Sequence, residues 1–296
     1  MSKQQLDAIL QASAAAPPPA SPDPVSWRDW FESINAQTPQ APGLNAETIN
    51  PGPWSAERLS ADNSEAGRLI LYFHGGGFLF GSSQSHRTIT SHLAVASGSE
   101  VLSVDYRLAP ENPAPAAHDD CFAAYRWALE QGYQAGQIAL VGDSAGGNLA
   151  LSTALRARDE GLPLPGCIVM MSPALDLAGE GDSHQVVSQP PLLTREVMDL
   201  FNQMYVQHGD LRSASVTPLY SDLSGLPPSL IHVGDWELLR DDSITISKRL
   251  QDAGVKAELK VWPDMVHCWQ LFAPMLSEGM QSLEKIAAFI RINTAR

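Results

Sequence analysis

Cysteine and basic residues are scarce in this chain of 296 residues. It has three cysteines and no pair at CxxC spacing, so neither a disulfide framework nor a structural zinc site is indicated. Lysine and arginine total 19 against 33 aspartate and glutamate residues, which leaves a formal net charge of −14. So acidic a chain is a poor partner for nucleic acid or an anionic membrane surface, because both attract basic side chains.

Long apolar runs are also missing. No stretch of about 18 apolar residues is present, so no membrane span is predicted. The apolar stretch nearest the N-terminus is interrupted by Asp7, whereas a secretion signal has an uninterrupted apolar core of roughly 7–15 residues. We therefore expect a cytoplasmic protein without stable membrane association. With 44% hydrophobic residues, a chain of this length is enough for one large domain with a substantial core.

What the sequence does contain, from Arg68 onward, is an alternation of short apolar runs and helical patterns. Buried strands that alternate with helices predict an α/β fold, with a mostly parallel sheet covered by helices on both faces. In such a sheet the active site lies at the carboxyl ends of the strands. The expected strands are 69–73, 101–106, 138–141, 167–171, 230–233 and 259–262, and the expected helices are 85–97, 115–131, 146–160, 242–253 and 277–292.

Two segments depart from this alternation. Residues 4–15 are expected to form a helix that stops at three prolines, and aromatic residues within 27–31 follow at helical spacing. These aromatics either pack in the core or cover an apolar pocket. Residues 176–227 contain an amphipathic helix at 192–207 and are too long for a simple crossover. We interpret them as an insertion over the carboxyl edge of the sheet, the alternative being an ordinary crossover with long loops.

The segment 142–146 reads Gly-Asp-Ser-Ala-Gly and fits the pattern G-x-S-x-G. It follows an expected strand and begins a helix, which is the strand–turn–helix context of a nucleophile elbow. The turn is tight, so its flanking positions must lack bulk, and Ser144 is left on strained backbone with its Oγ exposed. The N–H of Ala145, at the start of the helix, can bind a developing oxyanion. The alternative is a glycine-rich turn with an incidental serine.

The sequence His-Gly-Gly-Gly at 74–77 directly follows an expected strand. Consecutive glycines expose backbone N–H groups, and two of them can point at one oxyanion, with Ala145 as a third donor. The rival interpretation is a phosphate-binding loop. It is disfavoured because such loops carry a lysine or start a helix at once, whereas here Phe-Leu-Phe follows at 78–80.

A serine nucleophile needs a base. Among eight histidines, His267 lies just after the last expected strand, in a loop that can reach Ser144. A carboxylate must hold the tautomer of that base, and it should follow the strand 230–233, so that the chain order is serine, acid, histidine. Asp235 and Glu237 both meet this condition, and the residues alone do not choose between them.

Three motifs in order, at 74–77, 105–111 (Asp-Tyr-Arg-Leu-Ala-Pro-Glu) and 142–147, resemble those of the bacterial hormone-sensitive-lipase-like esterases, an α/β-hydrolase family. The resemblance covers the chain from about residue 68 to the C-terminus. It implies the α/β-hydrolase fold in a single domain, 1–296. It also implies a helical cap formed by about 1–45 and the insertion at about 180–215.

The resemblance also implies roles for site residues. The acid loop of the family commonly reads Asp-Pro-Leu-Arg-Asp, and here Glu237 begins the corresponding Glu-Leu-Leu-Arg-Asp, which points to Glu237 as the acid. The family's oxyanion hole falls on Gly75, Gly76, Gly77 and Ala145. In such proteins the segment at 105–111 is structural and braces the active-site loops.

The combined expectation is a carboxylic-ester hydrolase that acts on small-molecule esters with short to medium acyl chains. Ser144 would attack the ester carbonyl, His267 would take its proton and Glu237 would orient His267, with no metal or organic cofactor. The alternatives are an amidase or peptidase that uses the same three residues, and a non-catalytic small-molecule receptor on the same fold, which is disfavoured because such receptors lose the base and His267 is present here. Cys268, beside the expected base, is either inert packing or a reactive thiol. The sequence leaves the oligomeric state open, a homo-oligomer included.

Overall fold

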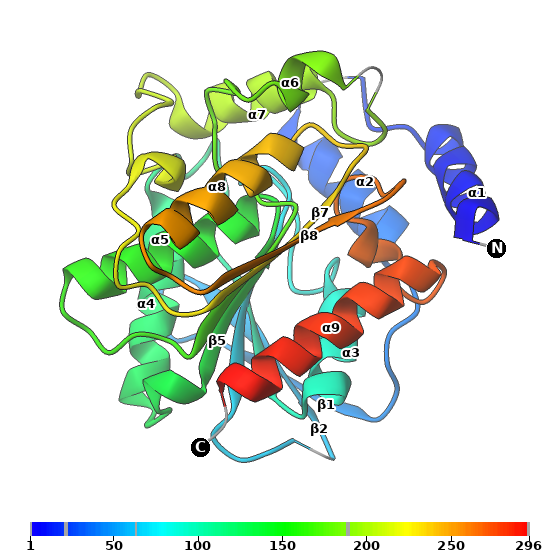
Figure 1. Cartoon of the computed structure of the whole chain (residues 1–296). Coiled ribbons are helices and arrows are strands. Elements are labelled where there is room, and N and C mark those ends of the chain that lie inside the picture. The colour runs from blue at the N-terminus through cyan, green and yellow to red at the C-terminus, as the bar shows by residue number, and fades with distance from the viewer. Residues whose placement is uncertain (1, 21–22, 63, 188–189, 295–296) are drawn as a thin grey trace.

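A computed structural model describes residues 2–20, 23–62, 64–187 and 190–294 (Figure 1). The remaining positions fall within the predicted domain, and some within its predicted cap, but lie outside the described residues: 1, 21–22, 63, 188–189 and 295–296. The described residues form one eight-stranded sheet in the order β1-β2-β4-β3-β5-β6-β7-β8. Its strands are β1 (Leu44–Ile49), β2 (Ser55–Ala61), β3 (Leu69–Phe73), β4 (Glu100–Asp105), β5 (Ile138–Asp143), β6 (Cys167–Met171), β7 (Ser229–Gly234) and β8 (Ala257–Trp262).

Strands β3 to β8 run parallel, as the sequence predicts. Every residue of β3, β5, β6 and β7 is buried, which explains why these strands are continuous apolar runs. Their register pairs Asp143 with Met171 and Gly234 with Trp262, so the strands end at one edge. The loops that follow them therefore meet there.

The strands β1 and β2 are not predicted from the sequence. They form an antiparallel pair, and β2 joins the sheet antiparallel to β4. β1 is largely exposed and reads Leu-Asn-Ala-Glu-Thr-Ile, so it offers neither an apolar run nor a strict alternation. These strands lie at the edge of the sheet away from β5, so the mostly parallel arrangement around β5 is unaffected.

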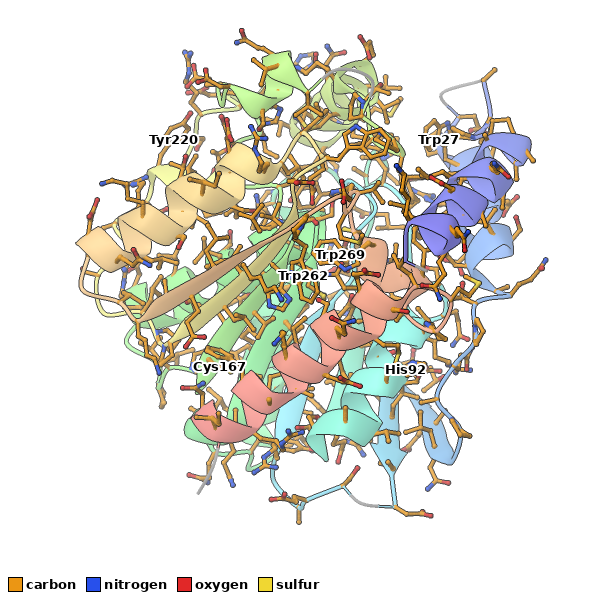
Figure 2. The ribbon with its side chains drawn as sticks, turned by 45° about the vertical axis from the view of Figure 1, so that its right-hand side comes forward. Trp27, His92, Cys167, Tyr220, Trp262 and Trp269 are labelled. Atoms are coloured by element: carbon orange, nitrogen blue, oxygen red, sulfur yellow. The ribbon has the colours of Figure 1, made fainter. Side chains whose placement is uncertain are left out.

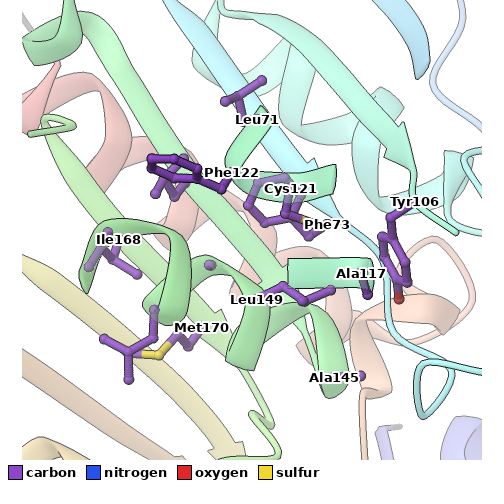
Figure 3. Packing of buried hydrophobic residues seen from close by; sticks show 14 of the residues in the cluster. Leu71, Phe73, Tyr106, Ala117, Cys121, Phe122, Ala145, Leu149, Ile168 and Met170 are labelled. Atoms are coloured by element: carbon purple, nitrogen blue, oxygen red, sulfur yellow. The ribbon is translucent and has the colours of Figure 1, made fainter. Parts of the chain in front are cut away.

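Helices cover both faces of the sheet, close to the predicted bounds. Cys121 and Phe122 lie on one face with Leu149, packed against the β3 side chains Leu71 and Phe73 (Figure 3). Side chains of alternate β3 residues face the other layer. The first layer consists of α4 (Ala116–Glu130), α5 (Ala145–Asp159) and α8 (Arg240–Asp252), and the second of α3 (Arg87–Ser97) and α9 (Ser277–Asn293).

Further helices lie over the carboxyl edge (Figure 1). They come from the N-terminal segment and from the connection between β6 and β7. The connection between β6 and β7 therefore carries helices of its own. These helices are α1 (Ser2–Ala15), α2 (Pro24–Asn35), α6 (Ser183–Val186) and α7 (Arg195–Val206).

The helix α1 packs against the end of β8 and the loop that follows it. Its side chains Leu6 and Ile9 share an apolar cluster with Met265 and with the adjacent rings of Trp262 and Trp269 (Figure 2). The N-terminal segment is thus part of the packed structure beside the loop that carries His267. In the described ranges, no helix combines the length and apolar character needed to cross a membrane.

Candidate active site

Ser144 occupies the sharp turn between β5 and α5. Its φ is +51°, a backbone conformation that residues other than glycine rarely adopt. Its N–H donates to the Met171 carbonyl at 2.8 Å. The turn leaves no room beside it, since a Cβ on Gly146 would lie 1.8 Å from the Phe73 carbonyl oxygen. The G-x-S-x-G segment therefore adopts the strained strand–turn–helix geometry expected from its sequence.

A chain of hydrogen bonds joins Ser144 to two other predicted residues. The Ser144 Oγ lies 3.1 Å from His267 Nε2, and His267 Nδ1 lies 2.8 Å from Glu237 Oε2. Since Glu237 is fully buried and its carboxylate only accepts, Nδ1 carries the proton and Nε2 is left to accept from the serine. The three side chains come from loops after β5, β7 and β8.

The structure separates the two acids that the sequence left open. Glu237 contacts His267 and is 1% exposed, whereas Asp235 lies on the exposed part of the same loop. The difference follows from the turn after β7, in which the Asp235 N–H donates to the Trp262 carbonyl and the chain then folds back inward. The next acids along the chain, Asp241 and Asp242, instead accept from residues of the insertion.

The glycines at 75–77 form the loop that faces Ser144. The Gly75 N–H is already engaged by the Asp143 carboxylate at 3.0 Å. Among the described residues, no acceptor engages the N–H groups of Gly76, Gly77 and Ala145, and all three residues line the cavity that contains Ser144. Gly76 has a φ of +107°, and a Cβ there would lie 2.2 Å from the Phe80 carbonyl oxygen. The loop therefore presents free donors at the serine.

The buried ionisable pair Asp143 and His86 supports this loop through the bond from the Gly75 N–H to Asp143. Asp143 accepts from the Tyr72 hydroxyl at 2.6 Å, and its other oxygen lies 3.4 Å from His86 Nε2. Burial acts to raise the pKa of Asp143, but His86 and the Tyr72 hydroxyl outweigh it and lower that pKa. Burial likewise opposes the charged form of His86, yet the Asp143 carboxylate raises its pKa. From the sequence, Asp143 is recognisable only as a position within the G-x-S-x-G motif.

His74 has a different state. Burial, with His86 nearby, lowers the pKa of His74 to about 3, so its ring is neutral at pH 7. Its Nδ1 bonds the Gly75 carbonyl at 2.7 Å, and its ring stacks on Tyr106 at 4.2 Å. These contacts orient the glycine loop. The 105–111 segment also braces its surroundings, since Asp105 accepts from the Ser83 N–H and Oγ.

A cavity of about 1220 Å³ opens at Ser144 and His267. Its walls come from α1, α2, α7 and the loop after η3 (Trp269–Phe272), and its lining is mostly apolar. Of the aromatic residues on α2 and α7, Trp27, Trp30, Phe31 and Phe201 line it. Met204 and Tyr205 are not among its lining residues. Tyr205 is fully buried and stacks on Phe78 instead, with ring centroids 3.9 Å apart.

Cys268 lies beside the site. Its Sγ is 3.5 Å from His267 Nε2, and the side chain is buried. Burial, with the nearby Asp143 carboxylate, raises the pKa of the thiol well above its usual range. The protonated thiol is a weak nucleophile, so the environment favours the packing interpretation of Cys268 over the reactive one.

Comparison with known proteins places the chain in a family. Residues 70–271 match the family described by the alpha/beta hydrolase fold, and the chain belongs to that family. It is 43% identical over 250 residues to an acetyl-hydrolase of Streptomyces hygroscopicus, covering 84% of this chain and 83% of that protein. It is 34% identical over 288 residues to an esterase of Acinetobacter venetianus, covering 96% and 94%.

A solved structure gives the same result. The crystal structure of an esterase from the bacterial hormone-sensitive lipase family superposes with a TM-score of 0.95 at 37% identity, covering 99% of both chains. The α/β-hydrolase fold and the family resemblance predicted from the sequence are confirmed. The chain is thus a serine hydrolase of the esterase class.

Proposed function

We propose that Ser144, His267 and Glu237 are the catalytic triad with which this esterase hydrolyses carboxylic esters. The observation that carries the proposal is the hydrogen-bonded chain from Ser144 through His267 to buried Glu237, at 3.1 and 2.8 Å, with the serine on the wall of an apolar cavity. Glu237 holds the imidazole in the tautomer that accepts a proton from serine and stabilises the imidazolium that forms.

Hydrolysis then takes two steps. In the first, His267 Nε2 takes the Ser144 proton while Oγ attacks the ester carbonyl, and the imidazolium returns that proton to the leaving alkoxide. In the second, water attacks the acyl-enzyme and gives a proton to His267. The proton passes to Ser144 Oγ as the carboxylic acid departs.

The oxyanion hole that we propose consists of the N–H groups of Gly76, Gly77 and Ala145. Their freedom from other acceptors among the described residues supports this role, because donors already aimed at the site need no reorganisation as charge develops. Gly75 shapes the loop, since its N–H is held by Asp143. Removing one such donor typically costs about 3 kcal/mol of transition-state stabilisation.

We also propose that 1–45 and the insertion at about 180–215 act as a cap on a single domain, 1–296, and select the substrate. The support is that α1, α2 and α7 contribute much of the apolar cavity wall. Such a wall suits small neutral esters with acyl chains of up to roughly eight carbons. The cytoplasmic location stays a prediction from the sequence.

The test is hydrolysis of p-nitrophenyl esters from acetate to palmitate by the wild type and by Ser144→Ala. We expect wild-type activity to peak at the shorter acyl chains and to be lost in Ser144→Ala. Circular dichroism should show that Ser144→Ala keeps the wild-type fold. Ser243→Ala, which removes a buried serine on α8, is the matched control. Unchanged turnover in Ser144→Ala would refute the mechanism, and a maximum at palmitate would refute the substrate assignment.

A further inference from the structure

The carboxyl end of β6 lies among the three proposed catalytic residues. The Met171 carbonyl accepts from the Ser144 N–H at 2.8 Å. The next residue, Ser172, places its Oγ 2.7 Å from Glu237 Oε1 and 3.3 Å from the Cys268 N–H, the residue after the base. Two consecutive residues thus contact the nucleophile, the acid and the base loop.

The direction of the Ser172 hydrogen bonds is determined by its partners. The Cys268 N–H can only donate and the Glu237 carboxylate can only accept, so the Ser172 hydroxyl accepts from the former and donates to the latter. Glu237 Oε1 also accepts from the Gly234 N–H at 2.7 Å. With Oε1 held by two donors, Oε2 is directed at His267.

Ser172 holds this position on unusual backbone. Its φ is +45°, in the left-handed region that favours glycine, and its N–H donates to the His232 carbonyl on β7 at 2.7 Å. The residue is fully buried, so its hydroxyl has no access to water and is committed to the two partners named above. A non-glycine residue held in such a conformation is frequently part of a functional site.

We propose that Ser172 is a positioning residue, which fixes the Glu237 carboxylate and ties it to the loop that carries His267. The inference rests on the proposed assignment of Glu237 as the acid. Without the hydroxyl, one donor to a buried carboxylate is lost and the Cys268 N–H loses its acceptor. The carboxylate can then turn away from His267, and the imidazolium of the transition state is less well supported.

The experiment compares Ser172→Ala with Ser172→Gly. Both remove the hydroxyl, but glycine relieves the positive φ and alanine does not, so the pair separates the side chain from the backbone. We expect both to lower kcat for p-nitrophenyl butyrate by about 10- to 100-fold, with KM within about twofold of wild type. The control is Ser243→Ala, whose hydroxyl bonds the Leu239 backbone carbonyl and none of the three proposed catalytic residues. Wild-type kcat in Ser172→Gly would overturn the proposal, whatever happens in Ser172→Ala.

A double-mutant cycle with Glu237→Gln tests the route of the effect. If Ser172 acts through the carboxylate, Ser172→Ala should cost less than about twofold in kcat once Glu237 is glutamine. Losses that multiply in the double variant would contradict this. Full activity of Glu237→Gln alone refutes the acid assignment and this inference with it. An inactive Glu237→Gln beside a fully active Ser172→Ala refutes the inference alone.

Discussion

The hydroxyl of Tyr205 on α7 lies 2.6 Å from His118 Nδ1 on α4, and both side chains are buried. His118 Nε2 lies 3.1 Å from the Oδ1 of Asn148 on α5, while the Asn148 amide donates to two backbone carbonyls. Nε2 therefore carries the proton and Nδ1 accepts from the tyrosine. The Tyr205 ring stacks on Phe78, directly after the glycine loop. Helix α7 is thereby tied both to the helix after Ser144 and to that loop.

Tyr205→Phe keeps the ring and its stacking but leaves His118 Nδ1 buried without a donor. We expect the free energy of unfolding to fall by about 1–2 kcal/mol, because a buried acceptor without a donor has lost its hydrogen bond to water and gains none in return. For a chain of this size the melting temperature should drop by a few degrees, about 2–4 °C per kcal/mol. Calorimetry checks this. Tyr220→Phe, at a partly exposed tyrosine, is the control, and a Tyr205→Phe melting temperature equal to wild type would contradict the expectation.

Buried neutral histidines give the stability a definite pH dependence. Burial lowers the pKa of His118 to about 4 and that of His232 to about 3, from an ordinary value of 6.5. Between pH 6.5 and 4 the unfolded chain therefore binds protons that the folded chain does not. Stability should fall on acidification through this window, by up to about 1.4 kcal/mol per pH unit for each such histidine.

The measurement for this prediction is the melting temperature at pH 7 and at pH 4.5. His118→Gln should show a smaller drop between the two than the wild type, because one titrating group is gone. His208→Gln, at an exposed histidine, is the matched control and should keep the wild-type drop. An equal drop in His118→Gln and wild type would show that His118 does not contribute.

The choice of acid is open to direct comparison. Glu237→Gln leaves a buried amide where the imidazolium needs a negative charge, so kcat should fall by about 10³-fold or more, while Asp235→Asn should stay within about threefold of wild type. Steady-state kinetics on a soluble ester measures both effects. The two variants are a matched pair, because each removes one charge from the same loop. A larger loss from Asp235→Asn would reverse the assignment.

Arg28 links α2 to the glycine loop. Its guanidinium donates to the Leu79 carbonyl at 2.8 Å and to Glu111 at 2.7 and 3.0 Å. Arg28→Ala frees these partners and also the Ala109 carbonyl, to which Arg28 donates at 2.8 Å. We therefore expect kcat/KM to fall by about tenfold with a smaller change in kcat, because the cavity wall loosens more than the triad. Arg28→Lys should recover only part of the loss, since it cannot reproduce the forked geometry. Arg126→Ala, at a surface ion pair, should match wild type in the same assay.

The sequence predicted the parallel strands, their helices and the places of Ser144 and His267 because each leaves a local pattern. Apolar runs mark strands buried on both faces, and a loop after a strand end is bound to reach the carboxyl edge. Glu237 and Asp235 sit two residues apart in one loop, so only the folded turn separates them. The contact of Ser172 with Glu237 joins residues 65 positions apart and depends on register and on a positive φ, neither of which a local pattern reveals.

The cavity has a consequence for how this enzyme can diverge. The family match and every proposed catalytic group lie within residues 70–271, whereas α1 and α2, which form part of the cavity wall, precede that stretch. Part of the cavity wall is thus encoded outside the stretch that carries the proposed catalytic groups, although α7 contributes to the wall from within that stretch. If the proposed cap role of 1–45 holds, exchange of the first 45 codons between relatives changes one wall of the cavity and leaves the proposed catalytic residues in place.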